Sequence, residues 1–381
     1  MSPVPNPPTT TQSESVKKTL MAFKHPLDPL TPDEIAAASL AVRHYVAEKT
    51  DVNVIKFISV NLLPPPKRAV LAYLGIPTSP GAISEAPIPI IRQAESDLLD
   101  VTTGNSYNTV LSYRGSKWQV DTFEKVPETQ HPQITPEEVL VAEKVVRNDP
   151  VVQRLAAEVG ISPNQIFCDG WAIGYDDRFP AQRRVLQALV FARFSGHENL
   201  YAHPLDFVPV IDSNTEEVIH IDFPPAYKKT PNGPTLTALS TAPPPLSDAE
   251  EALAHSNRER IHPPLARQNF LPDLMIEDDK DFEFRDDIKP LHIVQPEGVS
   301  FKMNGHELEW QNWKMHISFT QREGIVLSTI TYNDHGEVRP IIYRLSVAEM
   351  VVPYAAPEYP HPRKLAFDSY VILKIIGGML R

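Results

Sequence analysis

The chain has almost no cysteine and no long apolar segment. Cys168 is the only cysteine in 381 residues, so an internal disulfide and a cysteine-rich zinc site are excluded. No run approaches the roughly 18 apolar residues of a membrane-spanning helix. The first twenty residues are polar and lack the apolar core of a secretory signal. We therefore expect an intracellular protein, cytoplasmic or peroxisomal, that does not bind a membrane.

Clustered positive charge is also missing. The net charge is -12 and no long basic block occurs. A surface that binds nucleic acid regardless of sequence needs clustered Lys and Arg, so a nucleic-acid partner is not expected. The final residues, Met379-Leu380-Arg381, do not form a Ser-Lys-Leu-type peroxisomal address.

Proline, by contrast, is abundant. The 39 prolines predict short strands and helices separated by rigid, irregular connections rather than a helical bundle. Residues 1–22 are rich in Pro, Thr and Ser, which indicates a disordered N-terminus. Residues 223–290 are interpreted as a Pro-rich linker and an extended arm.

A strong helix start follows the disordered segment. Thr31 can cap the helix, Pro32 suits its first position, and Glu34 can reach back to complete a capping box. Apolar residues then recur at helical spacing, at Ile35, Ala38, Val42 and Val46. Strand-like runs follow at 54–60, 69–74, 108–113 and 118–123.

The same order then recurs. Thr135 and Glu138 form a second capping box, and a His-Pro pair precedes each box, at His25 and at His131. Strand-like runs follow at 165–175, 184–194, 207–211 and 218–221. We interpret the recurrence as two related α+β domains, each with a helix on an antiparallel sheet, over 23–126 and 127–222. Capping boxes are common, so a chance recurrence is the alternative.

From residue 291 the pattern becomes all-β. Strand-like runs occur at 300–303, 307–313, 314–319, 325–332 and 338–345. Asn304-Gly305 and the stretch 333–336 are turn signals between them. We expect residues 291–368 to form the opening strands of a large β-sandwich, followed by a tail at 369–381.

Several segments of this part resemble a known family. The segments are QPEG (295–298), WQNW (310–313), FTQREG (319–324), YND (332–334), RPIIYRLS (339–346) and EMVVPY (349–354). They resemble the start of the catalytic β-sandwich of copper amine oxidases, most closely the fungal intracellular type. The two repeated α+β domains are similar to the paired small, cystatin-like domains that precede that sandwich. The resemblance covers residues 25–368, nearly the whole chain.

The resemblance implies an activity, cofactors and partners. Members of the family oxidise primary amines to aldehydes, use oxygen as the acceptor, and release ammonia and hydrogen peroxide. Their cofactors are copper and topaquinone, a quinone made from a tyrosine of the sandwich, and they act as homodimers. A primary amine and oxygen are therefore the implied substrates, and a second copy is the implied partner.

The resemblance also implies three site residues. A carboxylate that removes a carbon-bound proton needs to lie within hydrogen-bonding reach of it, in an apolar pocket that raises its pKa. Asp368, at the end of PRKLAFD (362–368), matches the family's proton-abstracting base. Tyr354 and Ala366 match residues of the substrate channel.

After Asp368 the likeness is expected to end, because the tail 369–381 is unrelated to the family in sequence. The family's Asn-Tyr-Asp/Glu motif, whose tyrosine becomes the quinone, is absent, and none of the 13 histidines has a His-x-His or His-Glu-x-x-His spacing. We expect His25, His131, His197 and His203 to be surface or capping residues. We read the change at residue 368 as a truncation within the catalytic domain.

The chain is therefore expected to hold neither cofactor and to be inactive alone. The alternative hypothesis is a non-catalytic binding or assembly module that pairs with a full-length subunit.

Overall fold

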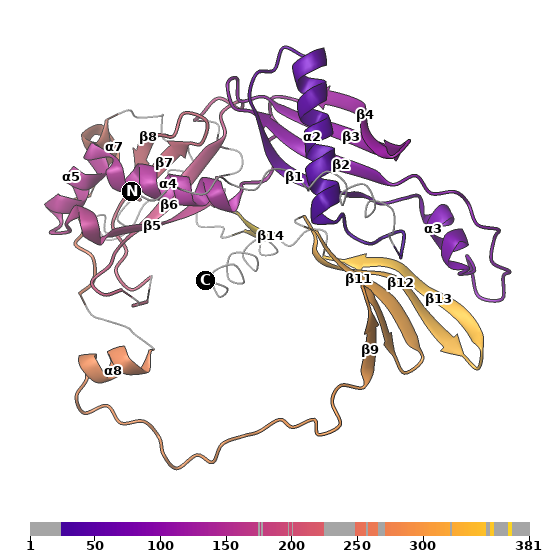
Figure 1. The fold of residues 1–381 in the computed structure, drawn as a ribbon. Helices are drawn as coiled ribbons and strands as arrows, with labels where there is room; N and C mark the ends of the chain where they lie inside the picture. The colour runs from indigo at the N-terminus through magenta and orange to yellow at the C-terminus, as the bar shows by residue number, and fades with distance from the viewer. Residues whose placement is uncertain are drawn as a thin grey trace, which may run out of the picture. The chain divides into compact units, whose positions relative to one another are not determined.

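The fold is taken from a computed structural model (Figure 1). It describes residues 24–347, apart from 174–175, 177, 197, 200, 225–247, 257, 266–270 and 321, and the backbone of 351–353 and 365–367. The chain divides into two compact units. One combines residues 1–127 with 295–349, and the other combines 128–294 with 350–381.

The first α+β domain is a helix on a four-stranded antiparallel sheet. Its elements are α2 (Pro32–Lys49), β1 (Ile55–Leu63), α3 (Lys67–Leu74), β2 (Gln93–Asp100), β3 (Ser106–Arg114) and β4 (Lys117–Lys125). The strands lie in sequence order, and α2 runs across one face of the sheet (Figure 1). Ala38, Val42 and Val46 of α2 pack in one core with Leu98 and Leu111 of the sheet, as the helical spacing predicted.

The second α+β domain repeats this plan. Its elements are α4 (Pro136–Asn148), α5 (Pro150–Glu158), the short 3-10 turn η1 (Pro163–Gln165), β5 (Ile166–Ala172), β6 (Val185–Ala192), β7 (Val208–Asp212) and β8 (Glu217–Asp222). The four strands again lie in sequence order and pair antiparallel. Val139, Ala142 and Val146 form the buried face of α4. The predicted pair of repeated helix-on-sheet domains is confirmed.

The two helices begin in the same way. Thr31 Oγ1 accepts the Glu34 N–H at 3.2 Å, while Glu34 Oε2 accepts the Thr31 N–H at 2.8 Å. Thr135 and Glu138 make the same two bonds, at 3.3 and 2.7 Å. Both capping boxes predicted from the sequence are therefore formed.

A buried arginine binds the glutamate of each capping box. The sequence predicted the boxes but not these arginine partners. Arg92, the residue before β2, binds both carboxylate oxygens of Glu34, at 2.5 and 2.9 Å. Arg184, the residue before β6, binds those of Glu138, at 2.7 and 3.0 Å. Each arginine also donates to two backbone carbonyls of the segment that precedes the helix. The matching position of these pairs supports a true duplication over chance recurrence.

The third sheet has five antiparallel strands and belongs to the first unit. Its strands are β9 (Phe301–Asn304), β10 (Glu307–Trp310), β11 (Trp313–Thr320), β12 (Gly324–Asp334) and β13 (Glu337–Ser346), in sequence order across the sheet. Gly305 and Gly336 have φ of 63° and 97° at the two predicted hairpin turns. The expected start of a β-sandwich is present as this sheet.

Two local expectations for the first domain need correction. Residues 69–74 were expected to form a strand, but they lie in α3. The sequence KRAVLAYL consists mostly of strong helix formers, and the helix ends at Gly75, which adopts φ 66°. Strand β2 was not expected, because QAESDLLD is rich in polar residues. Ala94, Ser96 and Leu98 nevertheless alternate to the buried face.

Smaller elements follow the second domain. Helices α7 (Ala249–His255) and α8 (Pro272–Asp278) lie within the segment 223–290, which was expected to be a linker and an extended arm. Residues 225–247 of this segment lie outside the described part. Across the residues that the structure describes, no helix has the length and apolar character needed to cross a bilayer.

Candidate functional site

The segments that carry the predicted catalytic residues meet in a short antiparallel ladder. Strand β14 (Val351–Pro353) pairs with β15 (Leu365–Phe367), so the described parts of EMVVPY and PRKLAFD lie side by side. Ala366, the expected channel residue, pairs with Val352. Tyr354 and Asp368 follow these strands directly in the sequence but lie outside the described residues. The catalytic and channel roles of the three residues stay predictions.

A second group of side chains was not suggested by the sequence. His25 and Asp28 lie in the segment before α2, and His316 lies in β11. Among the described residues they form a group whose potential ligand atoms lie within 4.8 Å of one another. His316 Nε2 donates to Asp28 Oδ1 at 3.0 Å. The two imidazole rings stack, with centroids 4.1 Å apart and planes 18° apart.

Hydrogen bonding assigns the proton on each ring. The Leu27 N–H donates to His25 Nδ1 at 3.1 Å, so this nitrogen carries no proton. The Asp28 carboxylate can only accept, so His316 Nε2 is the protonated nitrogen of that ring. Both imidazoles are buried, with 2% and 0% of their surfaces exposed for His25 and His316. The rings therefore form a stacked pair of neutral imidazoles.

The pKa shifts agree with this assignment. Burial, with His316 next to it, lowers the pKa of His25 from 6.5 to about 4. Burial also lowers the pKa of His316, although the bond to Asp28 opposes it. Burial would raise the pKa of Asp28, but the bonds from His316 and the His25 N–H hold that pKa below its usual value.

This group does not fit a copper centre of three histidines. It offers two imidazoles and one carboxylate. The lone pairs of an imidazole lie in the ring plane, so two nearly parallel stacked rings direct them alongside each other rather than toward one ion. His25 Nδ1 and His316 Nε2 are also already engaged in hydrogen bonds. The arrangement is that of a structural polar contact.

The other histidines give a mixed result against expectation. His131 is exposed, and its Nε2 lies 2.8 Å from the Ala181 carbonyl, which confirms the expected surface position. His25 is buried rather than on the surface, but its ring accepts the Leu27 N–H in the segment before α2. The expectation of a surface or capping residue is wrong for His203, which is 1% exposed. His203 packs beneath Phe194 and bonds to the Pro264 carbonyl. His197 lies outside the described residues.

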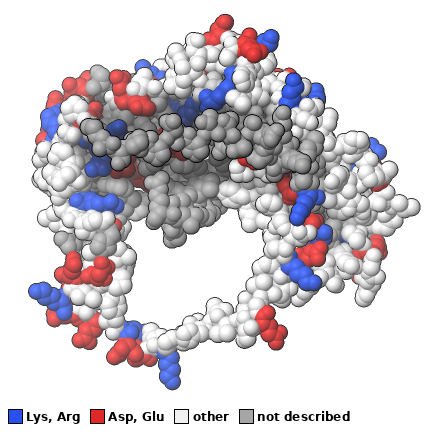
Figure 2. All heavy atoms as spheres, in the orientation of Figure 1, with Lys and Arg blue, Asp and Glu red and all other residues white. Residues whose placement is uncertain are grey.

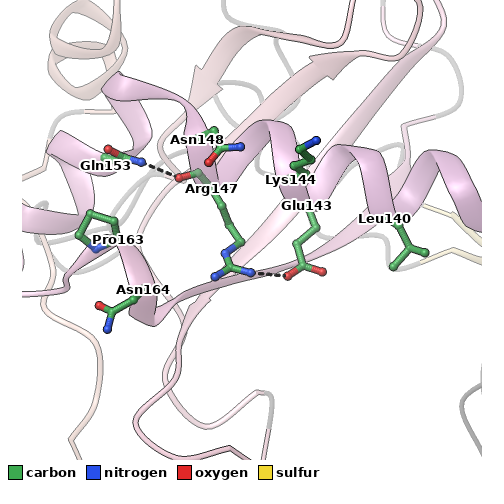
Figure 3. Close-up of a pocket in the computed structure, with 8 residues that line it drawn as sticks. All are labelled: Leu140, Glu143, Lys144, Arg147, Asn148, Gln153, Pro163 and Asn164. Atoms are coloured by element: carbon green, nitrogen blue, oxygen red, sulfur yellow. Dashed lines mark hydrogen bonds and ion pairs between the residues drawn. The ribbon is translucent and has the colours of Figure 1, made fainter. Parts of the chain in front are cut away.

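The pockets offer little further chemistry. One, of about 430 Å³, lies along α4 and the start of α5 (Figure 3). Among its lining residues, Arg147 pairs with Glu143 at 3.3 Å, and the Gln153 side chain donates to the backbone carbonyl of Arg147.

Another pocket, of about 360 Å³, is lined by His25, the end of α3 and side chains of β10 to β12. Its Lys314 lies 3.0 Å from Glu307 and 3.5 Å from Glu309. Lys314 is thus paired with both glutamates. On the face drawn in Figure 2, acidic and basic side chains are likewise interspersed.

Three comparisons relate the chain to known proteins. Residues 25–96 match the family model described as copper amine oxidase, N2 domain, and residues 137–238 match the N3 domain. Residues 302–375 match the copper amine oxidase enzyme domain. This last match runs past Asp368, where the sequence reasoning placed the end of the likeness. The three matches follow the order of the two α+β domains and the five-stranded sheet.

Relatives that match most of this chain agree with the three domain matches. The peroxisomal primary amine oxidase of Pichia angusta is 37% identical over 344 residues, which are 88% of this chain and 42% of that protein. Copper amine oxidase 1 of Schizosaccharomyces pombe is 34% identical over 354 residues, 90% of this chain and 42% of that protein. The chain therefore spans less than half the length of these relatives.

A solved structure shows the same fold. The copper-containing benzylamine oxidase from Hansenula polymorpha superposes with a TM-score of 0.68 at 24% identity. The superposition covers 91% of this chain and 48% of that one. At this level of identity the match is informative about the fold alone.

Proposed function

The chain belongs to the copper amine oxidase family, and we propose that it contributes the two N-terminal α+β domains and the first strands of the enzyme domain to a primary-amine oxidase. The reaction converts a primary amine, oxygen and water into an aldehyde, ammonia and hydrogen peroxide. The amine loses two electrons and oxygen gains them, so the atoms and charges balance. The observation that carries this proposal is the sequence of three domain matches along one chain.

Asp368 is the proposed base of this reaction. It follows β15 directly, in the segment that pairs with β14. A carboxylate there would take the proton from the α-carbon of the amine, and Tyr354 and Ala366 would line the channel that leads the substrate to it. Acid–base catalysis by a positioned carboxylate requires the oxygen to reach that proton. The support for these roles is the family likeness of both segments.

We propose that the residues in this chain do not supply the cofactors. The 381 residues contain no His-x-His pair, and the His25–Asp28–His316 group does not fit copper. Copper would supply the oxidative chemistry that makes topaquinone from a tyrosine. We therefore propose that the 381-residue chain has no oxidase activity unless it is joined to further enzyme-domain residues.

A cofactor assay tests this proposal. Purified chain would be incubated with copper in air, then stained for redox-cycling quinone and analysed for bound copper. The matched sample is a fusion in which residues 1–368 continue into the rest of the enzyme domain of the Pichia angusta relative. We expect quinone and about one copper per subunit in the fusion alone, since copper in proteins is held by a defined set of imidazoles. Quinone in the unextended chain would contradict the proposal.

A second candidate is an assembly module that pairs with a longer subunit, and the five-stranded sheet favours it. Its side chains Phe319, Ile325, Ile341, Ile342 and Leu345 are each at least 40% exposed. Exposed apolar side chains in this number on one sheet are typical of a surface that is covered in an assembly. Co-purification of the tagged chain with the fusion, but not with an unrelated protein, would favour this candidate.

The proposed location is inside the cell, in peroxisomes or the cytoplasm. The support is a Pichia angusta relative whose name includes the word peroxisomal.

A further inference from the structure

The two repeated domains differ in what their leading segments contact. In the second domain, Arg184 binds the carbonyls before α4, and His131 is exposed. In the first domain, Arg92 binds the Asp28 and Pro29 carbonyls in the same way. The first segment has additional contacts, because the rings of His25 and His316 stack and Asp28 accepts from His316. The extra contacts link the segment to strand β11.

Both imidazoles lack a place for a second proton. A proton on His25 Nδ1 would face the Leu27 N–H, which donates to that nitrogen, so one hydrogen bond would be lost. A proton on His316 Nδ1 would find no acceptor among the described residues, because that buried atom has no hydrogen-bond partner there. If both rings took up a proton, two positive charges would also stack 4.1 Å apart. Protonation therefore opposes the contact through geometry as well as through burial.

We propose that the stacked pair His25–His316 is a pH-sensitive joint that holds residues 24–30 against strand β11 while both rings are neutral and releases them when the pair takes up a proton. The joint lies within one compact unit of the fold. It does not depend on the proposed oxidase function, since it requires neither copper nor substrate.

The neighbouring charges do not cancel the lowering of the two histidine pKa values by burial. Asp28 and Glu307 favour protonation of His25, whereas Lys314 and His316 oppose it. Asp28 and Glu307 likewise favour protonation of His316, and His306, whose ring centroid lies 5.7 Å away, opposes it. Burial is the largest contribution for both rings, and the pKa of each is lowered in sum. The neutral pair is therefore the stable form near neutral pH.

The sign of the pH dependence follows from these shifts. A histidine with a lowered pKa in the closed form binds fewer protons there than in the open form. The closed form is thus fully stable above about pH 6.5, the ordinary pKa, and loses stability as the pH falls toward 4. One such proton makes the open form about thirtyfold more populated at pH 5 than at pH 7.5.

Hydrogen exchange followed by mass spectrometry measures this change on the 381-residue chain. Opening constants for residues 24–30 and 313–318 would be compared between pH 7.5 and pH 5, after correction for the intrinsic exchange rate. We expect the thirtyfold increase in residues 24–30 and none in residues 130–136, while residues 313–318 keep the backbone pairing of β11 with β10 and β12. Equal opening constants at the two pH values would overturn the proposal.

Variants distinguish opening caused by protonation of His25 and His316 from opening that acid causes elsewhere in the chain. His25→Gln and His316→Gln remove the titrating groups and should each flatten the pH dependence, while His131→Gln, the matched position of the second domain, should keep it. A wild-type pH profile in both joint variants would overturn the proposal. Zinc chloride serves as a further arm. Tight zinc binding that the His25→Gln change abolishes would identify a metal site and would also overturn it.

Discussion

Replacing Arg184 with alanine is expected to destabilise the second α+β domain by about 3–5 kcal/mol, the usual cost of removing one partner of a buried ion pair. Arg184 is 3% exposed and Glu138 is 5% exposed. The guanidinium binds both Glu138 oxygens and the Pro132 and Gln133 carbonyls. The substitution would remove the guanidinium from both Glu138 oxygens, to which the Thr135 N–H and the Ser213 hydroxyl would still donate, and would weaken the start of α4.

Urea unfolding at pH 7 measures this loss, with Arg183→Ala as the matched control. Arg183 is the neighbouring residue, but its side chain is 47% exposed and lies 3.7 Å from Asp212. Surface ion pairs contribute about 0–1 kcal/mol, so the control should stay close to wild type. A loss for Arg184→Ala no larger than that of the control would show that the pair does not hold the domain together.

The Arg184–Glu138 pair also makes the stability of the second domain depend on pH in the acidic range. Despite burial, which would raise it, the bonds from Arg184 lower the pKa of Glu138 from 4.5 to about 2. The lowered pKa means that the folded form binds fewer protons than the unfolded form. The contribution of this pair to the free energy of unfolding is therefore complete above pH 4.5. It is lost as the pH falls toward 2, by about 3 kcal/mol at most. The stability difference between wild type and Arg184→Ala should accordingly narrow on acidification.

Replacing Asp368 with asparagine is expected to lower kcat of the fusion by roughly 10²–10⁴-fold, the usual contribution of a general base. An amide of the same size cannot accept the proton, while the channel that binds the amine is unchanged. KM should therefore change much less than kcat. Quinone content should be equal in the two proteins, which separates a lost base from lost cofactor assembly.

Steady-state kinetics with a primary amine provide the measurement. Asp281→Asn is the control, because it removes an equivalent carboxyl from an exposed position of the same chain. A kcat of Asp368→Asn within threefold of the control would remove Asp368 as the base, because a general base contributes roughly 10²-fold or more. The family membership would stand in that case, since it rests on the domain matches.

Local signals were sufficient to predict much of the fold. The capping boxes at Thr31 and Thr135 need only residues three apart, and both formed. The turn at Gly305 depends on a single dipeptide. Strand β2 failed this kind of reasoning because its inward positions include Ser96, which is buried through a hydrogen bond to the Ser59 carbonyl of the neighbouring strand. Such a partner is not visible in a window of sequence.

The candidate sites show the same limit, because contacts between residues far apart in the sequence could not be predicted. Asp28 and His316 are separated by 288 residues, so no spacing rule could join them. Their contact arises because α2 and β11 are brought into one compact unit. The roles of Asp368, Tyr354 and Ala366 came from family resemblance, since an isolated aspartate in a sequence carries no chemical signal. The structure adds that their two segments pair as β14 and β15.

Amine-dependent peroxide release is the most direct measurement of the proposed function. The 381-residue chain and the fusion would be loaded with copper in air, and peroxide would be followed with benzylamine and with methylamine. We predict peroxide, with one aldehyde formed per peroxide, from the fusion and none from the 381-residue chain. Amine-dependent peroxide from the unextended chain, or its absence from a fusion that contains quinone, would contradict the account.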